Sequence, residues 1–397
     1  MKLIAFLFAT ACALGCSSAA PRSWQQPNFV ILVAEDLGRE WLGCYGGQEL
    51  KTTEIDRLAA NGARFETCYA APMPSISKVE LLTGRYPFRS GWMWENDVPK
   101  SGPPELDPGR EIVFARLLKD VGYTTGFAGV WNLNRPDEEG GLFRRHGFDR
   151  ALPSGNLGAI SDFVSGFLEE SREAPFAVCA FLPSAASGAG FKDHVLGLNE
   201  LVGRLMQRIH RLKLDSRTIV ILTSACGTDG LVAKAWNNLH VKGGKGTLRE
   251  VGINVPLIVS GSYWVKRGEV IRHLADFTDL LPTLLDLAGA RPPKDRVIDG
   301  RSFAEALSGR ELLNPREWIL SQQGGDRVVR NPRYKLYSSG RYYDVLADPL
   351  ESANLARTSN SEMIAERERL AAILRALPRD EPLAFPYARR IIVRRPQ

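Results

Sequence analysis

Hydrophobic residues gather in short, almost continuous runs that are separated by longer amphipathic stretches. Three runs stand out, at Phe29–Ala34, Phe176–Leu182 and Thr218–Thr223. Runs of this kind predict parallel strands that are buried on both faces of a sheet. Two further strands are expected at Thr124–Ala128 and Val255–Ser260.

Between these runs, apolar residues recur every three or four positions, which predicts helices. The expected helices are Thr53–Asn61, Ile112–Val121, His194–Leu212 and Asp276–Ala288. Strands that alternate with helices indicate an α/β domain whose central sheet is mostly parallel and flanked by helices on both faces. We assign this domain to residues 21–310.

The pattern changes after about Glu311. Short stretches joined by Gly, Asn and Ser turns predict antiparallel strands at Trp318–Ser321, Asp326–Arg330, Tyr334–Ser338 and Arg341–Val345. The spacing of Ser359 and Glu362 is typical of a capping box that opens a final helix. Residues 311–397 are therefore expected to form a small α+β subdomain, an antiparallel sheet plus a helix.

Residues 1–20 have the features of a signal segment. Lys2 precedes the apolar run Leu3–Leu14, which is too short to cross a bilayer core of about 30 Å but suits a signal peptide. Cys16 ends this run after a small residue, which resembles a bacterial lipobox and implies a lipid anchor at Cys16. Cleavage after Ala20 and a retained anchor are the alternatives. All three predict an extracytoplasmic protein, either a cell-envelope lipoprotein or a secreted one.

Composition excludes some classes of function. The 397 residues are 44% hydrophobic and 24% charged, which is typical of a globular chain rather than a disordered one or a membrane bundle. The 51 Lys and Arg against 45 Asp and Glu give a net charge of +6. Apart from a basic C-terminal tail these charges are scattered, so we predict no nucleic-acid partner and a weak preference for anions.

The cysteines and histidines show no metal-site spacing. Beyond the signal segment the cysteines are Cys44, Cys68, Cys179 and Cys226, without a Cys-x-x-Cys or Cys/His pattern, so no zinc site is expected. Cys179 lies within an apolar run and is expected in the core. A disulfide suits an extracytoplasmic protein, but the sequence assigns none. The histidines at 194, 210, 240 and 273 also lack ligand spacing.

Six segments in chain order resemble the sulfatase family of the alkaline-phosphatase-like superfamily. They are Pro27–Gly38, Ile55–Ala59, Leu81–Pro87, Gly246–Glu250 with Val255–Val259, Asp279–Gly289 with Asp299–Ser302, and Tyr343–Asp344 with Asp348–Pro349 and Asn354–Leu355. Each segment alone is a weak match, whereas six in the family's order are a specific one. The resemblance implies the sulfatase-like fold over residues 27–357.

The resemblance also implies a chemistry for which side chains are missing. Sulfatases cleave sulfate esters with a formylglycine, made from Cys or Ser, and a calcium ion. The modified position corresponds to Pro74, which has neither sulfur nor hydroxyl, so no formylglycine is expected. Glu35 and Asp36 match the family's first acidic pair and are the candidate metal ligands. The second pair reads Ala225-Cys226, of which alanine cannot ligate and a thiol is a poor calcium ligand.

The cationic groups implied around the sulfate are reduced as well. Val130 and Asn132 stand where the family has Lys and His. Lys78 replaces an Arg, which keeps the charge without the planar guanidinium. Lys245 matches a Lys that contacts sulfate in the family. Core-forming positions are thus kept while pocket positions 74, 130, 132, 225 and 226 are degenerate, which favours relaxed or redirected selection on the pocket.

Three hypotheses follow. In the first, the protein has lost formylglycine- and calcium-dependent hydrolysis and retains anion or sulfated-glycan binding through Lys78 and Lys245. In the second, it is an active metal-dependent sulfate or phosphate ester hydrolase, with Ser75 as nucleophile and a calcium ion on Glu35 and Asp36. In the third, it is a structural or assembly partner of an active paralogue.

Plainer interpretations stand beside these hypotheses. Ser75 suits a helix N-cap, a common position for serine ahead of a helical run. Asp229 is close enough in sequence to replace a missing metal ligand if its loop shifts. A glycan binder also needs exposed aromatic side chains near its cleft, for which the candidates are Trp92, Trp94, Trp131 and Trp236.

Overall fold

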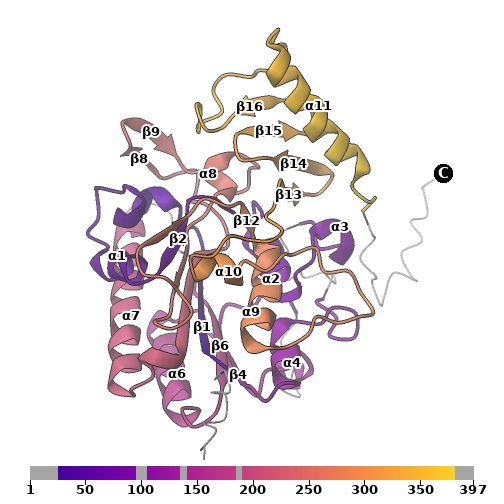
Figure 1. Cartoon of the computed structure of the whole chain (residues 1–397). Helices are drawn as coiled ribbons and strands as arrows, with labels where there is room; N and C mark the ends of the chain where they lie inside the picture. Colours follow the sequence, from indigo (N-terminus) through magenta and orange to yellow (C-terminus); the bar gives the residue numbers. More distant parts are fainter. Residues whose placement is uncertain (1–25, 95–104, 135–140, 185–189, 381–397) are drawn as a thin grey trace, which may run out of the picture.

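The computed structural model describes residues 26–94, 105–134, 141–184 and 190–380. The predicted signal segment with Cys16 lies outside the described residues. A large α/β body carries a small sheet and a helix on top (Figure 1), which confirms the predicted fold class. No helix within the described ranges has the length and apolar character to cross a membrane.

An eight-stranded sheet forms the centre of the body. In spatial order its strands are β11 (Glu269–Ile271), β2 (Ala63–Phe65), β10 (Leu257–Ser260), β7 (Thr218–Ser224), β1 (Asn28–Ala34), β6 (Phe176–Phe181), β4 (Thr124–Gly129) and β5 (Arg150–Pro153). Strand β10 is antiparallel to both neighbours, and the other pairings are parallel. The five strands predicted for this domain all occur.

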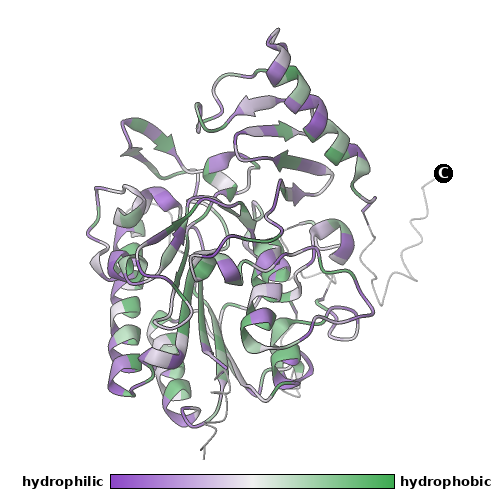
Figure 2. Cartoon of the chain, in the orientation of Figure 1, coloured by the Kyte–Doolittle hydropathy of each residue, from purple (hydrophilic) through white to green (hydrophobic). Residues whose placement is uncertain are grey.

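Two hydrophobic cores lie on opposite faces of this sheet. Phe29, Ile31 and Val33 of β1 enter one core, whereas Val30 and Leu32 enter the other, because successive strand side chains point to opposite faces. The helices over the first face are α2 (Pro74–Thr83), α4 (Phe114–Lys119) and α9 (Leu280–Ala288), and those over the second are α1 (Thr53–Ala60), α6 (Leu157–Glu170) and α7 (Phe191–Arg211). Figure 2 shows the hydrophobic strands between these helices.

Short elements complete the α/β body. The short helices are α3 (Pro87–Ser90), α5 (Leu142–Arg145), α8 (Glu250–Ile253) and α10 (Ala304–Leu307), and the 3-10 turns are η1 (Arg39–Trp41), η2 (Gly43–Tyr45), η3 (Asp215–Arg217) and η4 (Phe277–Asp279). The two small sheets pair β3 (Cys68–Tyr69) with β12 (Ala275–Asp276), and β8 (Ala233–Trp236) with β9 (Leu239–Lys242).

The C-terminal part is the expected antiparallel sheet plus helix. Its strands are β13 (Ile319–Gln323), β14 (Asp326–Arg330), β15 (Tyr334–Tyr337) and β16 (Tyr342–Asp344), and α11 (Ser361–Ala376) packs on one face. The other face meets the body, where the buried Lys335 Nζ lies 3.1 Å from Glu250 Oε1 and 2.9 Å from Glu351 Oε1. The buried ion pair between Lys335 and Glu250 therefore joins the sheet to α8.

Several sequence predictions need correction. The predicted capping box is wrong, because Asn360 is the N-cap of α11 and its side chain accepts from the Met363 amide. The helix predicted from His194 begins three residues earlier, at Phe191. Helix α6 and the hairpin β8–β9 were not predicted. The hairpin turns through Asn237 and Asn238, both at positive φ, a turn signal that the sequence already carried.

Candidate functional site

The candidate site lies where adjacent parallel strands end, the edge at which α/β sheets place their ligands. Glu35 and Asp36 follow β1, and Ala225 and Cys226 follow β7 beside it. The Ala225 amide donates to the Ala34 carbonyl at 2.8 Å, which holds the two loops together. The structure therefore brings the predicted metal pair, Glu35 and Asp36, next to Ala225 and Cys226.

Lys78 neutralises the first acidic residue. It projects from α2, is 1% exposed, and its Nζ lies 2.6 Å from Glu35 Oε1. The same ammonium donates to the Val130 carbonyl at 2.8 Å and lies 5.2 Å from the Phe181 ring centroid. Lys78 is therefore enclosed by a carboxylate, a carbonyl and an aromatic face.

Asp36 is neutralised in the same way by Lys245. The Lys245 Nζ lies 2.7 Å from Asp36 Oδ1, and the Cys226 thiol donates to the same oxygen at 3.2 Å. The Ser184 hydroxyl donates to the other oxygen, Oδ2. Asp36 also has a φ of 59°, a left-handed conformation that few non-glycine residues adopt. Both carboxylate oxygens thus already accept hydrogen bonds from the protein.

Electrostatics in this pocket disfavour a reactive thiol. Burial, followed by the Asp36 charge, raises the pKa of Cys226 well above its ordinary value, so the group stays a neutral thiol. Burial alone would lower the pKa of Lys245, but the hydrogen bond to Asp36 and the charges of Asp36 and Glu35 outweigh it, so the pKa is raised. Lys245 accordingly keeps its charge beside Asp36.

The predicted nucleophile region forms the start of α2. Pro74 is the first helical residue and Met73 is the N-cap, so the N-cap interpretation of Ser75 is wrong. The buried Ser75 Oγ accepts from Trp92 Nε1 at 3.1 Å and donates to the Trp94 carbonyl at 3.3 Å. Neither of these partners is a base that could take up the hydroxyl proton.

The remaining degenerate positions lie around the end of β4. Val130 donates its amide to the Phe181 carbonyl at 2.9 Å and uses its own carbonyl to hold Lys78. Asn132 is exposed and at positive φ, so it extends away from the buried part of the pocket. Asp229, the suggested replacement ligand, instead accepts from the Leu231 amide at 2.8 Å within its own turn.

One residue near the pocket escaped sequence reasoning. Burial lowers the pKa of His194, a residue of α7. The charges of Asp36 and Glu35 act to raise this pKa, so the imidazole is close enough to interact electrostatically with both carboxylates. Its Nε2 is buried and has no hydrogen-bond partner among the described residues. A histidine without ligand spacing gives no sequence signal, because only the fold brings α7 to the end of β1.

These side chains do not fit a calcium ion. Calcium takes six to eight oxygen ligands. The two carboxylates here are engaged by ammonium groups, and the neighbouring loop offers alanine and a thiol. In the described part of the chain, no cluster of three or more His, Cys, Asp or Glu side chains is placed to hold a metal ion.

The candidate aromatic side chains separate by exposure. Trp92 and Trp131 are buried, with 2% and 4% of their surface exposed. Trp236 is partly buried, and its Nε1 donates a hydrogen bond to the Tyr45 carbonyl. Trp94 is 59% exposed and follows the segment that contacts Ser75. One edge of its ring lies against Gly324, where any Cβ would come within 2.3 Å of the ring. Trp94 therefore presents an exposed aromatic ring, and its main-chain carbonyl contacts Ser75 at the start of α2.

Solved structures of the same fold are sulfatases and glycan-processing proteins. One from Bacteroides thetaiotaomicron, solved in a study of glycosaminoglycan metabolism, matches with a TM-score of 0.77 at 20% identity, over 88% of this chain and 99% of its own. Another, solved in complex with its substrate D-glucosamine-2-N,6-O-disulfate, matches with a TM-score of 0.73 at 17% identity, over 88% and 97%. These likenesses establish an alkaline-phosphatase-like fold of the sulfatase type.

Sequence comparison then gives the family. The Sulfatase family model matches residues 27–163. The N-acetylgalactosamine-6-sulfatase of Sus scrofa is 30% identical over 375 residues, covering 78% of this chain and 70% of the relative. The chain belongs to the sulfatase family, which confirms the family inferred from its six motifs.

Proposed function

We propose that this sulfatase-family protein binds anionic, sulfated glycans without hydrolysing them by the formylglycine and calcium route. The observation that carries the proposal is the double ion pair: Lys78 on Glu35 at 2.6 Å and Lys245 on Asp36 at 2.7 Å. Internal ammonium groups thus hold the carboxylates on which a calcium ion would depend.

Calcium would have to displace a buried lysine to reach Glu35. Breaking a buried ion pair costs about 3–5 kcal/mol when one charge is left unpaired. Neither Ala225 nor Cys226 supplies an oxygen side chain that would offset this cost. Pro74 also lacks any atom from which formylglycine could form. The missing nucleophile and the occupied carboxylates support the same conclusion independently.

Anion binding rests on the groups that solvent can reach. The Lys245 side chain is 23% exposed, and an ammonium carries three donors, of which Asp36 uses one. Trp94 adds an exposed aromatic ring whose main-chain carbonyl contacts Ser75. A structural relative takes a disulfated glucosamine as its substrate, which supports a sulfated sugar as the ligand class for this pocket. The extracytoplasmic location, through a lipid anchor at Cys16, belongs to the same proposal.

The test combines three measurements on the purified protein. Calorimetric titration with calcium should show no saturable binding up to millimolar concentration, and turnover of a chromogenic aryl sulfate should equal the blank. A sulfated oligosaccharide should bind, and Lys245→Gln should weaken this binding.

The opposite results identify the competing hypotheses. Micromolar calcium binding that is lost in Glu35→Gln/Asp36→Asn, with ester turnover lost in Ser75→Ala, would establish the active hydrolase. The absence of both glycan binding and turnover would leave the assembly-partner hypothesis, which co-purification with an active paralogue then tests.

A further inference from the structure

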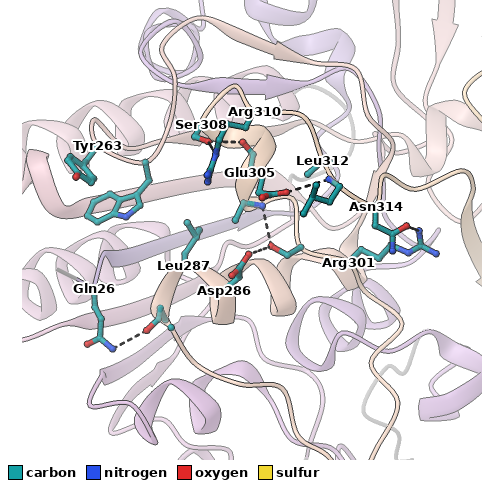
Figure 3. Close-up of a pocket in the computed structure, with 16 residues that line it drawn as sticks. Gln26, Tyr263, Asp286, Leu287, Arg301, Glu305, Ser308, Arg310, Leu312 and Asn314 are labelled. Carbon is teal, nitrogen blue, oxygen red and sulfur yellow. Dashed lines mark hydrogen bonds between the residues drawn. The ribbon is translucent and has the colours of Figure 1, made fainter. Parts of the chain in front are cut away.

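A cavity of about 1120 Å³ lies far from the sulfatase-like pocket (Figure 3). Its wall includes Gln26, two residues before β1, whereas Glu35 follows the opposite end of that strand. Nine residues of nearly extended chain span about 30 Å. The cavity therefore lies at the amino-terminal ends of the parallel strands, opposite the candidate site, and a ligand there would not reach Lys245.

One side of the cavity is aromatic. Tyr263 and Trp264 follow β10, and their ring centroids are 5.2 Å apart at 73°, an edge-to-face arrangement. Tyr263 is 65% exposed, and Trp264 is half-buried against the core below. An exposed aromatic side chain beside one that packs against the core suits the apolar C–H face of a sugar ring.

The lining also contains two arginines outside any ion pair of the described residues, Arg310 and Arg301, which lie apart along it (Figure 3). Arg310 Nε donates to Ser308 Oγ at 2.9 Å, and Arg301 NH1 donates to Asn314 Oδ1 at 3.2 Å. Within the described residues neither guanidinium contacts a carboxylate, in contrast to Arg316, which is buried on Asp279. Their remaining N–H groups match the planar oxygens of a carboxylate or sulfate.

Acceptors for hydroxyl groups complete the lining. Asp286 and Glu305 line the cavity, and Asp286 Oδ2 accepts from Ser302 Oγ at 2.8 Å (Figure 3). An ionised carboxylate only accepts hydrogen bonds, so it suits sugar hydroxyls. The two carboxylates balance the two arginines, so the lining suits a ligand that carries hydroxyl groups beside its acidic groups better than a densely charged polyphosphate.

We propose that this cavity is a second binding site, for an acidic oligosaccharide. The Tyr263–Trp264 pair packs against a sugar ring, Arg301 and Arg310 hold its acidic groups, and Asp286 and Glu305 accept from its hydroxyls. The volume is at the upper end of the range for small-molecule sites, so more than one sugar unit fits. This site is independent of the proposed glycan binding at Lys245.

The test is calorimetric titration of the full protein with a size-defined chondroitin sulfate hexasaccharide, with maltohexaose as the neutral probe. We expect two sites per chain for the acidic probe. Arg301→Gln/Arg310→Gln and Tyr263→Ala should each weaken one site about tenfold or more, since charge-assisted hydrogen bonds and aromatic contacts are lost. Lys245→Gln should affect the other site alone.

A matched control removes two charges elsewhere. Arg204→Gln/Arg211→Gln alters the exposed face of α7 and should leave both sites unchanged. The inference is overturned if this control weakens binding as much as the cavity variants do, if the cavity variants bind like the parent protein, or if the parent binds no acidic probe. If the parent protein binds the acidic probe at one site only, and the cavity variants weaken that site while Lys245→Gln does not, the proposed function is contradicted and the cavity site is supported.

Discussion

Replacing Lys78 by methionine tests whether the pocket depends on its internal cation. The substitution keeps the length of the side chain but removes the ammonium that lies between Glu35 and the Val130 carbonyl. Because Lys78 and Glu35 are 2% and 9% exposed at their side chains, the carboxylate would be left buried without a partner. We expect a loss of about 3–5 kcal/mol in the free energy of unfolding.

A companion variant separates charge from shape. Lys78→Met/Glu35→Gln removes both charges, so most of the loss should be recovered, with a coupling energy of about 2 kcal/mol or more between the two sites. The surface pair of Lys192 and Glu49 supplies the control, since Lys192→Met at a half-exposed side chain should cost at most about 1 kcal/mol.

Urea unfolding followed by tryptophan fluorescence measures all three variants against the parent protein, with circular dichroism to confirm that each is folded in buffer. The reasoning is refuted if Lys78→Met costs no more than Lys192→Met. It is also refuted if the double variant is as unstable as Lys78→Met, because an unpaired carboxylate would then not be the cause.

Three further predictions concern the same body. Gly129→Ala should lower the free energy of unfolding by about 3 kcal/mol or more, because φ is 109° and the new Cβ would lie 1.8 Å from the Phe181 carbonyl of β6. Gly122→Ala is the control: this glycine also has a positive φ but no atom near the new Cβ, so the loss should be smaller in the same urea assay. Burial lowers the pKa of His146 to about 4, below its ordinary 6.5. The neutral imidazole therefore stabilises the fold above pH 6.5, and this contribution is lost as the pH falls towards 4. In His146→Phe, the decrease in the free energy of unfolding between pH 7 and pH 4 should be smaller by up to about 3 kcal/mol. Ala225→Asp/Cys226→Asn should lower the melting temperature without calcium, because a carboxylate is introduced at a fully buried position next to the residue that contacts Asp36. Millimolar calcium should raise the melting temperature again if the new oxygen groups bind it, and no response to calcium would contradict this.

The sequence was sufficient for the central sheet. Runs such as Phe29–Ala34 are buried on both faces, and a strand of that kind can hardly be mistaken for a surface element. Element ends were less predictable, since the N-cap of α11 depends on whether Ser359 or Asn360 adopts the right backbone conformation, and both residue types are good caps. Helix α6 was missed because Gly158 and Gly166 weaken its helical pattern.

The proximity of the candidate site residues was predictable, but their pairwise contacts were not. Motif positions identified Glu35, Asp36, Lys78 and Lys245, and the structure gathers all four at one sheet edge. Their pairing could not be read from spacing, because Lys78 comes from a helix on one face of the sheet and Lys245 from the loop after β9. The approach of His194 depends on the packing of α7, which no local pattern encodes.

The two ion pairs give Lys78 and Lys245 a structural role. Two carboxylates at the end of β1 need counter-charge, and a buried carboxylate left unpaired destabilises the fold. Ammonium groups from α2 and the loop after β9 supply that charge. Neutralisation alone accounts for Lys78, whose side chain is 2% exposed, but Lys245 is 23% exposed and can reach a ligand as well. A glycan entering this pocket would therefore meet Lys245, and the effect of Lys245→Gln on binding distinguishes an anion site from a purely structural pair.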